Sequence, residues 1–209
     1  MGRSVMEASV PAKRPVKRQP KTPSQAIVAK AFHWINILSL LLLITSGLRI
    51  YNANPVFGGR EGWHFPQFLM IGNGLAEGRD WHFAIMWVYA LNLLCYGLYI
   101  LITKRWQHRF ANSNDLKAVQ VSQNEKRKNY ALHRLVYTAI VPLLLLAIAS
   151  GLAMYKPAQL HWLSAFFGDW QTLRTVHFIT VPIVLFFTFV HSLLALRVGT
   201  FRLIKSMFV

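Results

Sequence analysis

The stretch RTVHFITVPIVLFFTFVHSLLALR, residues 174–197, is an apolar run with one histidine near each end, His177 and His191. An α-helix rises about 1.5 Å per residue, so roughly 20 apolar residues cross a hydrocarbon core of about 30 Å. The stretch is therefore predicted to be a membrane-spanning helix. Titratable side chains are costly at that depth and usually mark functional sites. The two histidines should therefore have partners elsewhere in the chain.

Three more runs have a similar length, which gives four predicted spans: 27–48, 81–103, 135–155 and 176–196. Hydrophobic residues make up 54% of the chain and charged residues only 14%, which is unlike a soluble domain. Backbone groups in lipid must be paired within their own segment, so the spans are helices. We predict an all-α integral membrane four-helix bundle over residues 27–209, preceded by a disordered basic cytoplasmic tail over residues 1–26.

The net charge of +16 follows a topological pattern. Eighteen of the 23 Lys and Arg residues lie before or at the start of the first run, between the second and third runs, or at the C-terminal end. The positive-inside rule then places both termini in the cytoplasm and the first and third loops outside. We assign the basic tail to contact with anionic membrane lipid, with no nucleic-acid partner. No internal repeat, phosphate-binding loop or pair of carboxylates is evident.

Depth sorts the histidines of the spans into two pairs. His33 and His191 lie toward the cytoplasmic side, whereas His82 and His177 lie toward the outer side. The step from His177 to His191 is about 1400° on a helix, 40° short of four turns, so both point to one face about 21 Å apart. The fourth span thus offers one ligand to each of two stacked sites.

Two neutral imidazoles in an apolar bundle interior fit a bis-histidine haem iron, whereas zinc usually requires three or four protein ligands. Interhelical hydrogen bonds or a proton path are the alternative roles for such histidines. The spans contain no Asp or Glu that would serve proton transport. Gly47, at the depth of the outer pair, and Gly97, at the depth of the inner pair, would admit a porphyrin edge; ordinary small-residue helix packing is an equal alternative.

The chain resembles the bacterial di-haem cytochrome b membrane subunits that serve nickel–iron hydrogenases, formate dehydrogenases and thiosulfate reductase-type molybdopterin enzymes. The resemblance runs from about Phe32 to the C-terminus and is carried by FHWINILSLLLLITSGLRIYNANP, RDWHFAIMWVYALN, NYALHRLVYTAIVPLLLLAIASGLAMY and RTVHFITVPIVLFFTFVHSLLA. It implies two b-type haems, with His82 and His177 as axial ligands of one and His33 and His191 as those of the other. His133 departs from the pattern: it would compete with His33 as ligand or bind a quinone oxygen.

The resemblance implies a bacterial inner-membrane subunit that passes electrons between a periplasmic redox protein and quinone. The partner would be a molybdopterin, iron–sulfur or cytochrome c protein. Arg49, Arg79 and Arg174 are candidates to bind outer haem propionates, or they only set topology. The quinone-site candidates are Tyr130, His133 and Arg134. Two alternatives stay open: a stand-alone superoxide/quinone oxidoreductase of the same fold, and a haem-free four-span transporter or assembly factor.

Overall fold

The computed structural model describes residues 27–208, with side chains described as far as residue 197; the predicted cytoplasmic tail lies outside these residues. Every regular element within residues 27–208 is helical. Four helices are long and apolar enough to cross a membrane, which confirms the prediction of an all-α protein with four spans. They are α1 (Ile27–Ala53), α2 (Leu75–Ile102), α5 (Glu125–Tyr155) and α7 (Trp170–Phe208).

Short helical segments lie in the connections between the spans. The loop after α1 contains η1 (Gly59–Glu61) and η2 (Gln67–Leu69), the loop after α2 contains α3 (Trp106–Arg109) and α4 (Ser113–Val121), and the loop after α5 contains α6 (His161–Phe166).

All four long helices extend beyond the apolar runs that predict them, and in α5 and α7 a polar side chain caps the added first turn. The side chain of Asn124 accepts hydrogen bonds from the backbone N–H groups of Lys126 and Arg127, which starts α5 well before its apolar part. The Asp169 carboxylate accepts hydrogen bonds from Thr172 at the start of α7. These bonds hold the pKa of Asp169 below its ordinary value, and the bond from the Thr172 hydroxyl has the largest effect. Hydropathy therefore predicts the part of each helix that faces lipid.

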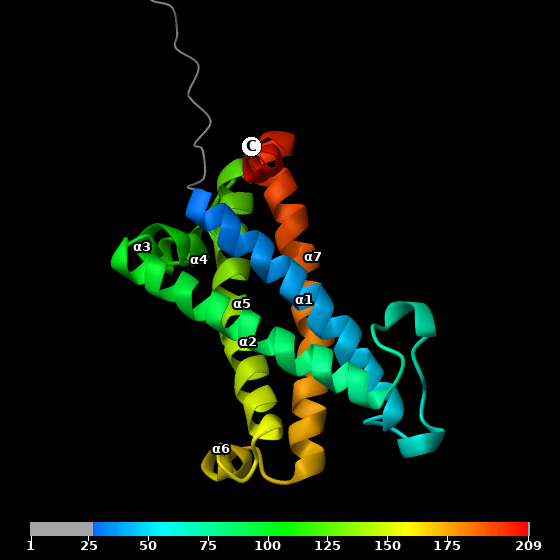
Figure 1. The fold of residues 1–209 in the computed structure, drawn as a ribbon. Helices are drawn as coiled ribbons and strands as arrows, with labels where there is room; N and C mark the ends of the chain where they lie inside the picture. The colour runs from blue at the N-terminus through cyan, green and yellow to red at the C-terminus, as the bar shows by residue number, and fades with distance from the viewer. Residues whose placement is uncertain (1–26, 209) are drawn as a thin grey trace, which may run out of the picture.

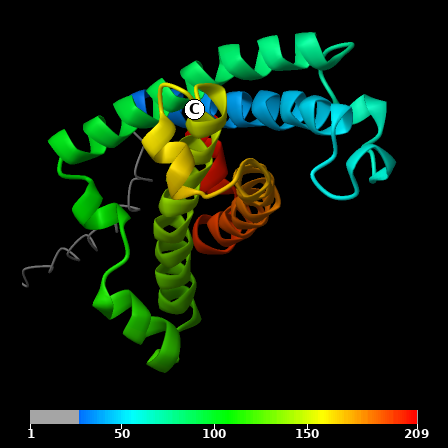
Figure 2. The ribbon, with the colours of Figure 1, turned by 90° about the horizontal axis from the view of Figure 1, so that it is seen from below.

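The four spans form two helix pairs. α1 packs along α2 and α5 packs along α7, whereas α1 and α7 meet over a shorter length. The α1/α2 pair crosses the α5/α7 pair obliquely (Figure 1), and the view from below shows α1 and α2 running side by side across the other two helices (Figure 2). Large apolar side chains point outward from all four helices, as expected of surfaces that face lipid; they include Leu38, Leu94, Leu145 and Phe186. The space between the two pairs is where a site can form.

The loop between α1 and α2, which the sequence predicts to lie outside, folds back on the end of α1. The Asn52 side chain forms two hydrogen bonds of 2.9 Å with the backbone N–H and C=O of Phe65. The guanidinium of Arg49 donates to the Gln67 side chain at 2.9 Å. These bonds hold the loop against the end of the α1/α2 pair.

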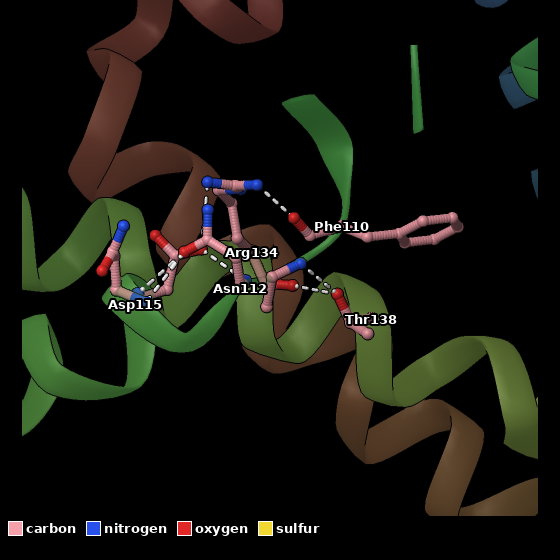
Figure 3. A network of polar contacts seen from close by, with 7 residues as sticks. Phe110, Asn112, Asp115, Arg134 and Thr138 are labelled. Carbon is pink, nitrogen blue, oxygen red and sulfur yellow. Dashed lines mark hydrogen bonds and ion pairs between the residues drawn. The ribbon is translucent and has the colours of Figure 1, made fainter. Parts of the chain in front are cut away.

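On the opposite end, a polar cluster fastens α4 to α5 (Figure 3). Arg134 on α5 forms an ion pair with Asp115 on α4, at 2.9 Å, and also donates to the backbone oxygen of Phe110. Asp115 and Asn112 form a reciprocal capping box that starts α4. The Thr138 hydroxyl accepts from the backbone N–H of Ala111 at 2.8 Å. One arginine therefore organises the loop between α2 and α5.

We predict that Asp115→Ala lowers the melting temperature of the detergent-solubilised protein. The substitution removes both the capping box and the partner of Arg134, with a cost on the order of 2 kcal/mol, below that of a fully buried pair because both side chains keep some contact with water. Glu125→Ala, which removes an exposed acidic residue from the first turn of α5, is the matched control. Equal melting temperatures for the two variants would contradict this role of Asp115.

Candidate functional site

His82 on α2 and His177 on α7 face each other across the space between the helix pairs. Their ring centroids are 6.4 Å apart and their planes are inclined by 80°. Metal–imidazole bonds of about 2.0–2.1 Å on opposite sides of one ion, plus roughly 1 Å from each nitrogen to its ring centre, require centroids about 6 Å apart. The separation therefore fits one ion between the two rings. Among the described residues no three His, Cys, Asp or Glu side chains form a metal-binding cluster.

Each imidazole is held from behind by a serine on the neighbouring helix. His82 Nδ1 lies 3.0 Å from the hydroxyl of Ser46 on α1, and His177 Nδ1 lies 3.0 Å from the hydroxyl of Ser150 on α5. Since Nδ1 is engaged in both rings, Nε2 is the nitrogen available to a metal in each. The donor set is thus two neutral imidazoles, which suits haem iron.

Glycines next to the serines allow the rings to lie this close to the helices. A Cβ atom added at Gly47 would lie 3.3 Å from Cε1 of His82, and one added at Gly151 would lie 3.1 Å from Cε1 of His177. Both distances are tighter than ordinary van der Waals contact. Any other residue at these positions would displace the imidazole from its present place.

A cavity of about 490 Å³ surrounds the two histidines and is lined by all four spans. This volume lies in the range of about 300–1,000 Å³ that is typical of cofactor and ligand sites. Its wall is mostly apolar and includes Leu40, Ile44, Met86, Leu144, Ile148 and Val181. Tyr89 also lines it, and its buried hydroxyl has no hydrogen-bond partner within the described part of the chain. The residues present therefore fit a large planar apolar group with a metal at its centre.

The site is built from an internal repeat. Ser-Gly-Leu-x-x-Tyr occurs at 46–51 on α1 and at 150–155 on α5, and Arg-x-x-His-Phe occurs at 79–83 on α2 and at 174–178 on α7. The expectation that the chain has no internal repeat is wrong. The similarity escapes a reading by hydropathy because the matching motifs are short and the loops between them differ in length.

Aromatic contacts between the pairs follow the same repeat. Tyr51 of α1 stacks on Phe178 of α7 with centroids 4.6 Å apart, and Tyr155 of α5 meets Phe83 of α2 at 4.8 Å. Each contact joins a repeated tyrosine to the repeated phenylalanine of the other pair. The two pairs thus correspond to each other, with α1 matching α5 and α2 matching α7.

The predicted outer-site residues separate into two groups. Gly47, Arg79 and Arg174 line the cavity together with His82 and His177. Arg49 does not; its side chain packs against Gly78 and binds Gln67.

At the predicted inner site, the structure brings His191 together with His133. Their rings stack with centroids 4.7 Å apart and planes inclined by 27°, closer than two rings on opposite sides of one metal ion. His33 lies on α1, with its ring centroid 6.2 Å from that of its neighbour Trp34. A Cβ atom added at Gly97 would meet nothing within 4 Å, so Gly97 provides no close cradle of the kind seen at Gly47.

Two quinone-site candidates lie apart from this inner cluster. Tyr130 is exposed on the first part of α5. Arg134 is engaged by Asp115 and by the Phe110 carbonyl (Figure 3). The residues that the sequence reading missed are Ser46, Ser150 and Gly151, and the repeated Ser-Gly-Leu was the signal that pointed to them.

Comparison with known proteins identifies relatives of the whole membrane part. The family model described as prokaryotic cytochrome b561 matches residues 24–209. A protein of Azospira oryzae, named as putative protein-methionine-sulfoxide reductase subunit YedZ1, is 29% identical over 168 residues, which cover 76% of this chain and 83% of that protein. No solved structure matches the chain.

We predict that Gly151→Val reduces the haem content of the purified protein, because the added side chain takes the place of the His177 ring. Gly74→Val is the matched control, since it adds the same side chain just before α2, in extended backbone and with open space around it. The measurement is haem per polypeptide by pyridine haemochrome, with folded protein quantified by circular dichroism. Equal haem content in both variants would show that His177 does not need this close approach.

Proposed function

The chain belongs to the prokaryotic cytochrome b561 family, and we propose that it carries electrons between quinol and a periplasmic oxidoreductase through haems held by its histidines. Family membership confirms the predicted resemblance to bacterial cytochrome b membrane subunits and implies a b-type haem. Together with the four spans it makes the chain a multi-pass protein of the bacterial inner membrane. It also removes the haem-free transporter from the alternatives.

The observation that carries the proposal is the His82–His177 pair. The two Nε2 atoms would hold the iron of the outer haem, and the apolar wall of the cavity would enclose the macrocycle and exclude water. A b-type haem held by these two residues would supply one-electron transfer. Arg79 and Arg174 line the same cavity, where a guanidinium pairs well with a propionate carboxylate. Arg174 is oriented by hydrogen bonds with Gln171 and with the backbone oxygen of Asn54.

The repeat supports His33 and His191 as ligands of a second, inner haem. It equates His33 with Tyr137, since each lies thirteen residues before its serine, and His191 with Tyr96, since each lies fourteen residues after its histidine. Tyr96 and Tyr137 reach each other, with hydroxyls 3.3 Å apart. By the same correspondence, positions 33 and 191 should have a similar separation, and their two imidazoles would hold the iron of the inner haem.

His133 is then the candidate for quinone chemistry. Its ring lies on His191, and its buried Nε2 has no hydrogen-bond partner among the described residues. A quinone oxygen would supply that partner near the cytoplasmic face. Tyr130 and Arg134 are weaker candidates, because one is exposed and the other is engaged in the ion pair with Asp115.

The relative's name favours one direction of electron flow. A reductase consumes electrons, so a membrane subunit similar to YedZ1 would oxidise quinol at the inner site and deliver electrons outward through the outer haem. The periplasmic partner would then be a reductase, with a molybdopterin enzyme the type expected from the sequence. A stand-alone superoxide/quinone oxidoreductase should have a more polar outer surface than α6, where Trp162 and Phe166 are 70% and 79% exposed.

We predict that His82→Ala and His177→Ala each remove the same haem from the purified protein, because each takes away one of two axial ligands. The check is haem stoichiometry by pyridine haemochrome, together with a reduced-minus-oxidised spectrum. His161→Ala, in the outer helix α6, is the control and should keep the full haem content. Retention of all haem by both variants would contradict the proposed site.

For the inner site, His33→Ala should lower the haem content, whereas His133→Ala should keep the haem and slow reduction of the cytochrome by a quinol. The first variant removes a proposed ligand and the second a proposed quinone contact. Haem stoichiometry and the rate of reduction by a soluble quinol separate the two effects. Loss of haem from His133→Ala alone would assign the inner ligand to His133 instead.

A further inference from the structure

We propose that Ser46 and Ser150 are positioning residues that fix the tautomer of His82 and His177 and thereby set the midpoint potential of the outer haem. This inference rests on the proposed outer haem, and it assigns a role to two residues that touch neither haem nor substrate. It depends on which atom in each serine–histidine contact carries the hydrogen.

The hydrogen of each serine hydroxyl is already committed. Ser46 Oγ lies 2.6 Å from the backbone oxygen of Leu42, and Ser150 Oγ lies 2.7 Å from that of Leu146. A hydroxyl has one hydrogen to donate, and a carbonyl can only accept. Toward the imidazole, each serine is therefore an acceptor.

It follows that Nδ1 of each histidine carries the proton. The carbonyl oxygens of Leu43 and Ala147 also lie 3.2 Å from Ser46 Oγ and Ser150 Oγ, so each Nδ1–H is directed at an acceptor-rich side of its neighbouring helix. Nε2 is then left unprotonated in both rings, which is the form that binds a metal.

The two serine–histidine contacts are also buried and closely packed. Both serines have no exposed surface, and each is followed by the glycine on which its histidine rests. Partners of this kind raise the basicity of a metal-bound imidazole, and their loss commonly costs about 10- to 100-fold in metal affinity. A more basic imidazole favours the oxidised, more positive iron. Removing the acceptor should therefore raise the midpoint potential.

The test uses Ser46→Ala, Ser150→Ala and the double variant, with Ser39→Ala as the matched control. Ser39 is buried on the same helix as Ser46 and bonds back to Ile35 O at 2.6 Å. Its substitution therefore removes the same type of intrahelical bond without touching His82 or His177. The measurements are the midpoint potential of each haem by redox titration and haem per folded polypeptide.

We expect Ser46→Ala and Ser150→Ala to raise the midpoint potential of one haem by similar amounts. The double variant should raise that potential further or lose that haem. Ser39→Ala should leave the potential unchanged. Ser46→Cys and Ser150→Cys preserve the volume while weakening the acceptor, and they should shift the same potential should an alanine variant fail to fold. Wild-type potentials and wild-type haem content in all four single variants of Ser46 and Ser150, alanine and cysteine alike, would overturn the inference.

Failure of the proposed function gives a different result. In that case His82→Ala and His177→Ala retain all their haem, whereas failure of this inference alone leaves those two variants depleted and the serine variants unchanged.

Discussion

The structure depends on one constraint: two neutral imidazoles must be held facing each other inside a membrane, with room for one metal ion between the rings. Their desolvation is costly, and lipid itself provides no contact that would fix the separation or the orientation of the two rings. In the fold, each histidine contacts a serine hydroxyl and packs closely against a glycine, both on the neighbouring helix. The helix pairing, the small residues and the cavity all follow from that arrangement.

Helix pairing explains why small residues appear where they do. Without a hydrophobic force between helices in lipid, close packing is the main source of association. Near the end of α1 in the first pair, the Arg49 side chain packs against Gly78 of α2. At the matching positions of the second pair stand Ala153 and Leu173, both almost fully buried. In the first pair the large residue is on α1 and the small residue on α2, whereas in the second pair the small residue is on α5 and the large residue on α7. The two pairs therefore share an architecture but differ in which helix carries the large side chain.

Much of this arrangement was predictable from the sequence. Hydropathy predicts the spans because lipid demands apolar length, and depth predicts His82 opposite His177 because two helices that begin from the same side bring equal positions together. The serines escaped prediction because a single hydroxyl in a span is common and usually bonds to its own helix. The inner site is harder still: His33 and His133 lie at similar depth, and only packing decides which of them meets His191.

The central claim is that one haem lies between the two helix pairs. An experimental structure of the haem-loaded protein, by electron cryo-microscopy or crystallography, tests it most directly. The account predicts iron bound by Nε2 of both His82 and His177, with Nδ1 of each ring still on Ser46 and Ser150. An iron bound by any other pair of residues, with the space between His82 and His177 empty of haem, would contradict it.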